Sequence, residues 1–143
     1  MQITTWFIAK EDEAEAIESI VTTEEHSPED WTHVEFPLIE MELMALFAAL
    51  RGTDDLTDEP TLEDPLVFRE EDGLLIARVV DSFLQALARV TAENLPGLTD
   101  AWVERIDQDH HEPEELRTIL LALANFAREA VARRSPVLSL STF

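Results

Sequence analysis

The chain of 143 residues contains no cysteine. This absence excludes disulfides, zinc–thiolate sites and thiol catalysis together. Only three glycines are present, so no glycine-rich phosphate loop can be written, and the Gly-x-Ser-x-Gly pattern of serine hydrolases is also missing. No apolar stretch approaches the ~20 residues of a membrane helix, and the N-terminus lacks the basic start and long apolar core of a signal peptide. We therefore expect a soluble, cytoplasmic protein.

Basic residues are scarce. Ten lysines and arginines face 31 acidic residues, which gives a formal net charge of −21, and Lys10 is the only lysine. Phosphate backbones and anionic membranes repel such a surface, so we expect neither nucleic-acid nor membrane binding. Three interpretations stay open: hydration or adaptation to a salty cytoplasm, electrostatic attraction of a basic protein partner, and cation binding.

The length fits one domain over residues 1–143. β-Branched and aromatic residues predict a strand at 2–9, and alternating side chains predict another at 137–143. The stretch LVFREEDGLLIARVV, residues 66–80, predicts a hairpin with arms at 67–68 and 75–79 and a turn at Asp72–Gly73. The continuous apolar second arm indicates a strand covered on both faces. A brief extended piece is expected at 32–36.

Apolar side chains recurring every three or four residues predict five helices. Their expected ranges are 11–20, 40–52, 82–90, 96–106 and 113–134. Gly52 has the position of a helix C-cap glycine, and Asp81 that of an N-cap. The sequence therefore predicts an α+β fold, with one small, mainly antiparallel sheet of N- and C-terminal strands plus the central hairpin, packed by about five helices.

The stretch DQDHHEPEE, residues 107–115, combines two adjacent histidines with five carboxylates and is the first candidate site. His110 and His111 are weak metal-ligand candidates, because neighbouring side chains in an extended segment point in opposite directions and no His-x-x-x-His spacing is present. Pro113 suits the first position of a helix, Glu114 and Glu115 favour its positive end, and Glu112 or His111 then takes the cap. We interpret the run as a helix start and predict no metal.

Two further segments offer binding residues. The acidic segment TDDLTDEPTLEDP, residues 53–65, is the longest candidate for a recognition loop. Trp31 is expected to be a core residue that pins its loop, and if exposed it becomes the best interface anchor. The predicted binding residues are Trp31, His33, Asp54, Asp55, Asp58, Glu59, Glu63 and Asp64.

The order of the pieces resembles the YfbM-like group of small bacterial proteins. The likeness rests on an N-terminal strand, an amphipathic helix, an apolar helix ending in Leu50-Arg51-Gly52, the segment VVDSFLQALARV and a long C-terminal helix followed by a final apolar strand. The resemblance implies an α+β fold and a bacterial cytoplasmic setting. Some members of the group look like immunity-type neighbours of toxins, and the group supplies no activity to carry over.

No residue nominates itself as a catalytic group, and no cofactor is predicted. We favour a non-enzymatic protein-binding module, of which an inhibitor or immunity-type partner of a basic protein is one form. The first alternative is a small carboxylate- or metal-dependent hydrolase that uses His33 or His110. The second is that the acidity reflects only a high-salt habitat. The oligomeric state stays open.

Overall fold

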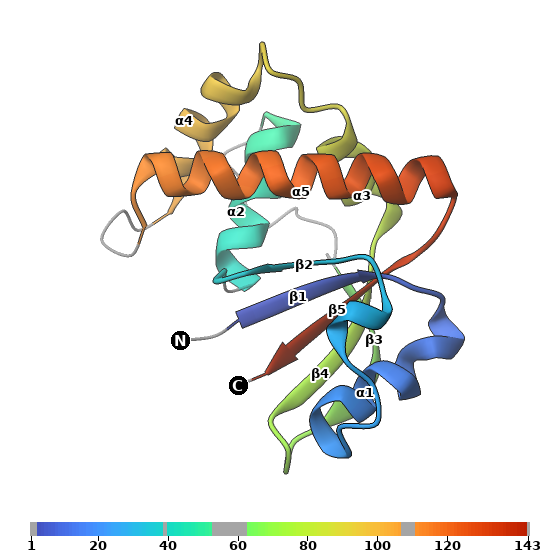
Figure 1. Ribbon diagram of the computed structural model, residues 1–143. Helices are drawn as coiled ribbons and strands as arrows, with labels where there is room; N and C mark the ends of the chain where they lie inside the picture. Colours follow the sequence, from blue (N-terminus) through green and yellow to red (C-terminus); the bar gives the residue numbers. More distant parts are fainter. Residues whose placement is uncertain (1–2, 39, 53–62, 107–110, 143) are drawn as a thin grey trace.

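The computed structural model describes residues 3–38, 40–52, 63–106 and 111–142 (Figure 1). Within them the chain forms five strands, five α-helices and two short 3-10 helices. The strands are β1 (Ile3–Ile8), β2 (His33–Phe36), β3 (Glu63–Arg69), β4 (Leu74–Val79) and β5 (Val137–Thr142). The helices are η1 (Glu11–Glu13), α1 (Ala14–Thr22), η2 (Pro28–Asp30), α2 (Glu40–Arg51), α3 (Asp81–Ala88), α4 (Leu95–Arg105) and α5 (Pro113–Arg133). The predicted α+β class is confirmed.

The strands form one antiparallel sheet in the order β2-β1-β5-β4-β3. The N- and C-terminal strands are therefore neighbours, paired from Ile3 with Thr142 to Ile8 with Val137. The extended piece expected at 32–36 is the edge strand β2, and β3 is the opposite edge. Because β5 lies between β1 and β4, the sheet can be completed only when the last residues of the described chain are in place.

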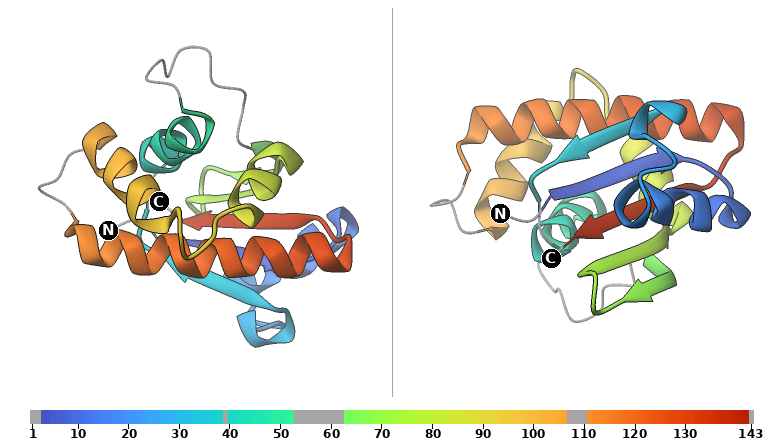
Figure 2. Two further views of the ribbon diagram at one scale, coloured as in Figure 1. Left: turned by 90° about the horizontal axis from the view of Figure 1, so that it is seen from above. Right: turned by 60° about the horizontal axis from the view of Figure 1, so that its bottom comes forward.

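Each face of the sheet is covered by helices, because alternate side chains of a strand point to opposite faces (Figure 2). Trp6 and Ile8 belong to the larger core, which α2, α3, α4 and α5 cover. Phe7 belongs to a smaller core on the other face, under α1. The predicted coverage of the second hairpin arm on both faces is confirmed, since Ile76 packs in the smaller core and Val79 in the larger.

Helix α1 is held to the second face by packing and by charge. Its buried side chains Ala14 and Ile17 lie in the smaller core. Arg69 of β3 reaches Glu18 of α1 at 3.3 Å between Nε and Oε1. Arg78 of β4 reaches Glu11 of η1 at 2.8 Å between Nη1 and Oε1. The η1–α1 segment is thus fixed against the β3–β4 end of the sheet.

Helix α5 is the longest helix and lies across the other face (Figure 1). It begins at Pro113 with Glu112 as N-cap, so the predicted helix start is confirmed. Leu116, Leu120 and Leu123 recur at helical spacing and are fully buried, or nearly so. None of the helices in the described ranges, α5 included, is long and apolar enough to cross a membrane.

Two local predictions were wrong. Asp81 is the first residue of α3, and its N-cap is Val80. The Asp81 carboxylate is turned toward Arg78, with 3.4 Å between Oδ1 and Nη2, so the ion pair replaces the cap. Residues 63–65 were expected in a loop but belong to β3, paired with β4 from Glu63 opposite Val79. Pairing with the backbone of β4 holds these residues in a strand, although Glu, Asp and Pro have poor strand propensity.

Candidate functional site

Trp31 lies between η2 and β2 and is half-buried. Its indole Nε1 donates a hydrogen bond to Glu13 Oε2 at 2.9 Å. Its ring meets Phe7 of β1 edge to face, with 5.6 Å between the ring centroids. Trp31 therefore fastens both η1 and the β1–β2 pair, as a residue that pins its loop should, and leaves part of the ring accessible.

The two histidines near Trp31 are engaged locally. His26 Nδ1 lies 3.3 Å from Asp30 Oδ2, and its ring centroid is 5.7 Å from that of Trp31. His33 Nδ1 lies 3.2 Å from the carbonyl oxygen of Trp31, and its ring packs beside Phe7. Among the residues that the structure describes, no group of three or more histidines and carboxylates is arranged to hold a metal ion.

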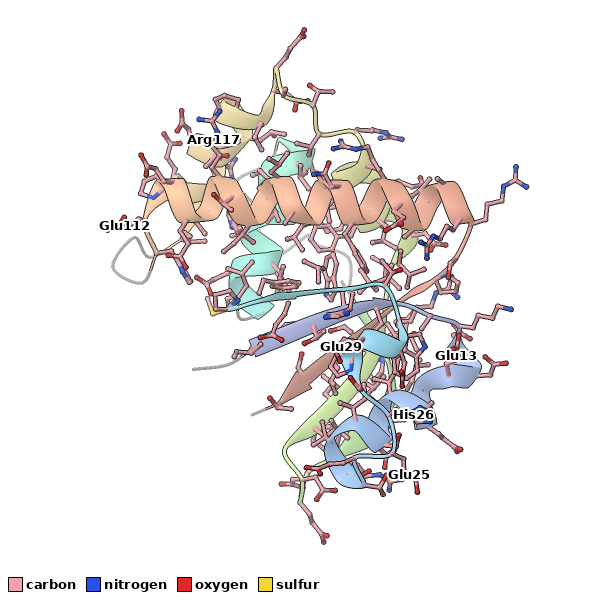
Figure 3. All side chains as sticks on the ribbon, viewed as in Figure 1. Glu13, Glu25, His26, Glu29, Glu112 and Arg117 are labelled. Atoms are coloured by element: carbon pink, nitrogen blue, oxygen red, sulfur yellow. The ribbon has the colours of Figure 1, made fainter. Side chains whose placement is uncertain are left out.

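These residues belong to a segment of one charge sign, residues 11–35, which we call the acidic corner. It holds ten acidic residues, and neither lysine nor arginine occurs from there until Arg51. The structure folds it into η1, α1, η2 and β2. Most of its carboxylates are exposed, namely Glu11, Asp12, Glu15, Glu24, Glu25, Glu29, Asp30 and Glu35. Figure 3 shows Glu13, Glu25, His26 and Glu29 on these elements, with Glu112 and Arg117 at the far end of the molecule.

Hydrogen bonds keep two of these carboxyl groups anionic. The backbone N–H of Lys10 and then the Trp31 indole hold the pKa of Glu13 below its usual value. The Ser27 hydroxyl lowers the pKa of Glu29. Ser27 also caps η2, because its hydroxyl oxygen accepts a hydrogen bond from the Glu29 backbone N–H at 3.4 Å, while its own backbone N–H donates to Asp30 Oδ2 at 3.2 Å. Local hydrogen bonds in the acidic corner therefore favour the anionic form of Glu13 and Glu29.

The acidic loop expected at 53–65 lies only partly within the described residues. Asp54, Asp55, Asp58 and Glu59 lie outside the described residues. Glu63 and Asp64 begin β3, and Asp64 is exposed opposite Arg78 in the register of the β3–β4 pair. The structure thus places Asp64 on the sheet edge, whereas Trp31 and His33 lie in the acidic corner.

His111 has a role that the sequence did not reveal, whereas His110 lies outside the described residues. His111 Nε2 lies 2.8 Å from Glu42 Oε2 of α2, with 9% of the imidazole and 11% of the carboxylate exposed. His111 Nδ1 is 3.6 Å from Glu115 Oε1 and has no hydrogen-bond partner in the described structure. The one signal for this pair was Glu42 itself, a carboxylate within the most apolar helix.

The Glu42–His111 pair joins α2 to the start of α5. The backbone at Glu42 is also held by Trp102 of α4, whose Nε1 donates a hydrogen bond to the Glu42 carbonyl oxygen at 2.9 Å. A buried imidazole–carboxylate pair could transfer a proton, but a metal would need a third converging ligand. We therefore interpret the pair as a polar connection in the helix layer.

No protein family model matches this chain, and neither does any curated protein or solved structure.

Proposed function

We propose that this protein is a non-enzymatic binding module whose acidic corner docks a basic protein. The observation that carries the proposal is the charge of residues 11–35, ten carboxylates without a lysine or arginine, in the segment that includes the half-buried Trp31. Complementary charge speeds the encounter of two proteins and selects among partners. A surface rich in arginine and lysine is the matching chemistry.

The acidic corner is preorganised for such contact. Trp31 is bonded to Glu13, Arg78 to Glu11 and Arg69 to Glu18. Binding by a surface that is already ordered spends little conformational entropy. Glu15, Glu25 and Glu29 stay exposed and form no ion pair with described residues, so their charge is available to a partner.

Trp31 supplies the aromatic anchor in this proposal. Tryptophan, tyrosine and arginine dominate the energetics of protein interfaces. The ring packs against Phe7 and beside His26, its Nε1 is bonded to Glu13, and part of the ring stays accessible. An arginine of the partner can stack on this ring while its guanidinium meets a carboxylate.

The proposal keeps the setting expected from the sequence, a bacterial cytoplasm, and includes an inhibitor or immunity-type role against a basic protein. The likeness to the YfbM-like group stays a prediction. Neither nucleic acid nor a membrane is proposed as a partner, because both carry the same charge sign as the acidic corner.

The test is a pull-down from native lysate at about 50 mM salt, followed by affinity measurement with the purified captured protein at about 50 and about 300 mM salt. The variant E15Q/E25Q/E29Q removes three exposed charges from the acidic corner. We expect it to weaken binding about tenfold at the lower salt, since each exposed ion pair contributes a fraction of a kcal/mol to about one. The loss should shrink at the higher salt.

The matched control is E93Q/D100N/E104Q, which removes three exposed charges on and beside α4, away from the acidic corner (Figure 1). Binding by the control should equal that of the parent protein. Equal weakening by both triple variants would show that only overall charge matters. Binding that is unaffected by salt, or absent at low salt, would refute the proposal.

The two alternatives make different predictions. A metal-dependent hydrolase predicts heat and stabilisation when chelator-stripped protein is titrated with divalent metals. A purely habitat-driven acidity predicts a free energy of unfolding that rises steeply with salt, because screening relieves the repulsion among carboxylates.

A further inference from the structure

A cavity of about 300 Å³ lies where α3 and the C-terminal end of α5 approach β4. Leu84 of α3 and Val131 of α5 are among its apolar lining residues. Its polar lining includes Arg78, Asp81, Gln85 and Arg134. The volume equals roughly ten water molecules of the liquid, which is the size of a small organic molecule. None of its lining residues belongs to the acidic corner.

Of the two arginines that line this cavity, Arg134 is the one whose guanidinium forms no ion pair with a described residue. Arg78 is bound to Glu11 and Asp81, and the hydrogen bond that its guanidinium donates to Glu11 is the main reason that the pKa of Arg78 is raised. The guanidinium of Arg134 makes no hydrogen bond or ion pair with any described residue. A guanidinium presents a planar fork of donors that matches a carboxylate with two parallel hydrogen bonds.

The backbone of Arg134 has a conformation that glycine adopts more easily than arginine. Arg134 ends α5 in the left-handed region, with φ 53° and ψ 39°. Its N–H bonds to Val131 O, and Ser135 N–H reaches back to Ala130 O at 3.1 Å. This is the helix ending at which glycine is favoured, since a Cβ is strained there. An arginine in a glycine position carries an energetic cost that a binding role would explain.

Four basic residues lie near this end of the sheet, and carboxylates pair with two of them, Arg78 and Arg133. The N–H of Ala9 bonds to the carbonyl oxygen of Pro136, which brings Lys10 close to the end of α5. With Arg78, Arg133 and Arg134, this end of the sheet holds four of the ten basic residues. Among the described residues, Arg134 is thus the arginine of this group that is left for an anion, in a chain whose net charge opposes the approach of an anion.

We propose that this cavity binds a small organic monocarboxylate. The carboxylate head pairs with the guanidinium of Arg134, and the Gln85 amide on the same rim can donate a further hydrogen bond. The apolar body of the ligand lies against Leu84 and Val131. A single negative charge suits the site better than a phosphate dianion, because Asp81 lies on the rim.

The test is a titration followed by two-dimensional amide NMR at constant ionic strength. The probe is benzoate, with benzylammonium as the probe of opposite charge and inorganic phosphate as the dianion. We expect saturable shifts for benzoate at the amides of Leu84, Val131 and Arg134, and none for the other two probes. Absence of saturable benzoate shifts refutes the site, and saturation by phosphate but not benzoate refutes the carboxylate assignment.

The decisive variant is R134G, which removes the fork and relieves the strained backbone. We expect its melting temperature to rise while its affinity for benzoate falls at least about tenfold. R134K keeps the charge without the fork and should lose affinity severalfold. R134G binding within twofold of the parent protein would overturn the proposal.

Two matched controls separate strain from charge. Glu24, with φ 59°, is the other non-glycine residue with a positive φ among the described residues, so E24G should raise the melting temperature without changing benzoate binding. Arg117 lies toward the far end of α5 (Figure 3), so R117A removes the same charge away from the cavity and should leave binding unchanged. A loss of affinity in R117A equal to that in R134G would show that the effect is general electrostatics, and would refute the site.

Discussion

The Glu42–His111 pair provides the sharpest prediction about stability. Its 2.8 Å contact is almost closed to water. Glu42 lies in α2, whereas His111 lies just before the start of α5, so the two residues are far apart in the sequence. H111A leaves a carboxylate with little solvent, and E42A leaves the imidazole Nε2 without an acceptor. We expect each single variant to lower the free energy of unfolding by about 2 kcal/mol, because a hydrogen bond to a charged group contributes about 1.5–3 kcal/mol.

The double variant E42A/H111A should cost less than the sum of the two single variants. The difference is the coupling energy of the pair, which we expect to be about 1.5 kcal/mol. Urea denaturation followed by circular dichroism measures all four proteins of the cycle. Trp102 donates its hydrogen bond to the backbone carbonyl oxygen of residue 42, so E42A and E42A/H111A both retain this bond.

Two controls set the scale of this cycle. E42Q keeps a hydrogen-bond acceptor for His111 and should cost less than E42A. E115Q changes the second carboxylate near His111. The Glu115 side chain is 47% exposed and its Oε1 lies 3.6 Å from His111 Nδ1, so E115Q should change the free energy of unfolding by less than about 0.5 kcal/mol. Single-variant effects that add within about 0.3 kcal/mol would show that the pair is not energetically coupled, and would refute the reasoning.

Two further predictions concern single side chains. Ser139 Oγ is buried without a hydrogen-bond partner in the described structure, so S139A should be neutral or should raise the free energy of unfolding by up to about 1 kcal/mol in urea denaturation. A measurable fall in the free energy of unfolding of S139A would contradict this prediction. E13Q should cost at most about 1 kcal/mol at pH 7. Because the folded pKa of Glu13 is depressed, its contribution exists above the usual value of 4.5 and disappears as the pH falls below it, so parent and variant should converge in acid unfolding.

The secondary structure followed from local patterns. The three- and four-residue spacing of Leu116, Leu120 and Leu123 predicted α5, and Pro113 marked its start, because helical geometry places such residues on one face. The alternation at 137–143 predicted the final strand, observed as β5 (Val137–Thr142), because successive side chains of a strand point to opposite faces. The predicted N-cap role of Asp81 was wrong, because its carboxylate could bond either to the helix N-terminus or to an arginine. In the structure it pairs with Arg78, which is positioned by the β3–β4 pair and by η1.

The sequence by itself determined the composition-based exclusions, the α+β class and the excess of negative charge around Trp31. Only the tertiary structure decided that the two terminal strands pair side by side, that His111 meets Glu42, and that Arg134 borders a cavity beside α3. The physical reason is the distance along the chain over which each interaction acts. Periodicity and capping act over one or two helical turns, whereas these contacts join residues brought together by the burial of both sheet faces, which no local pattern encodes.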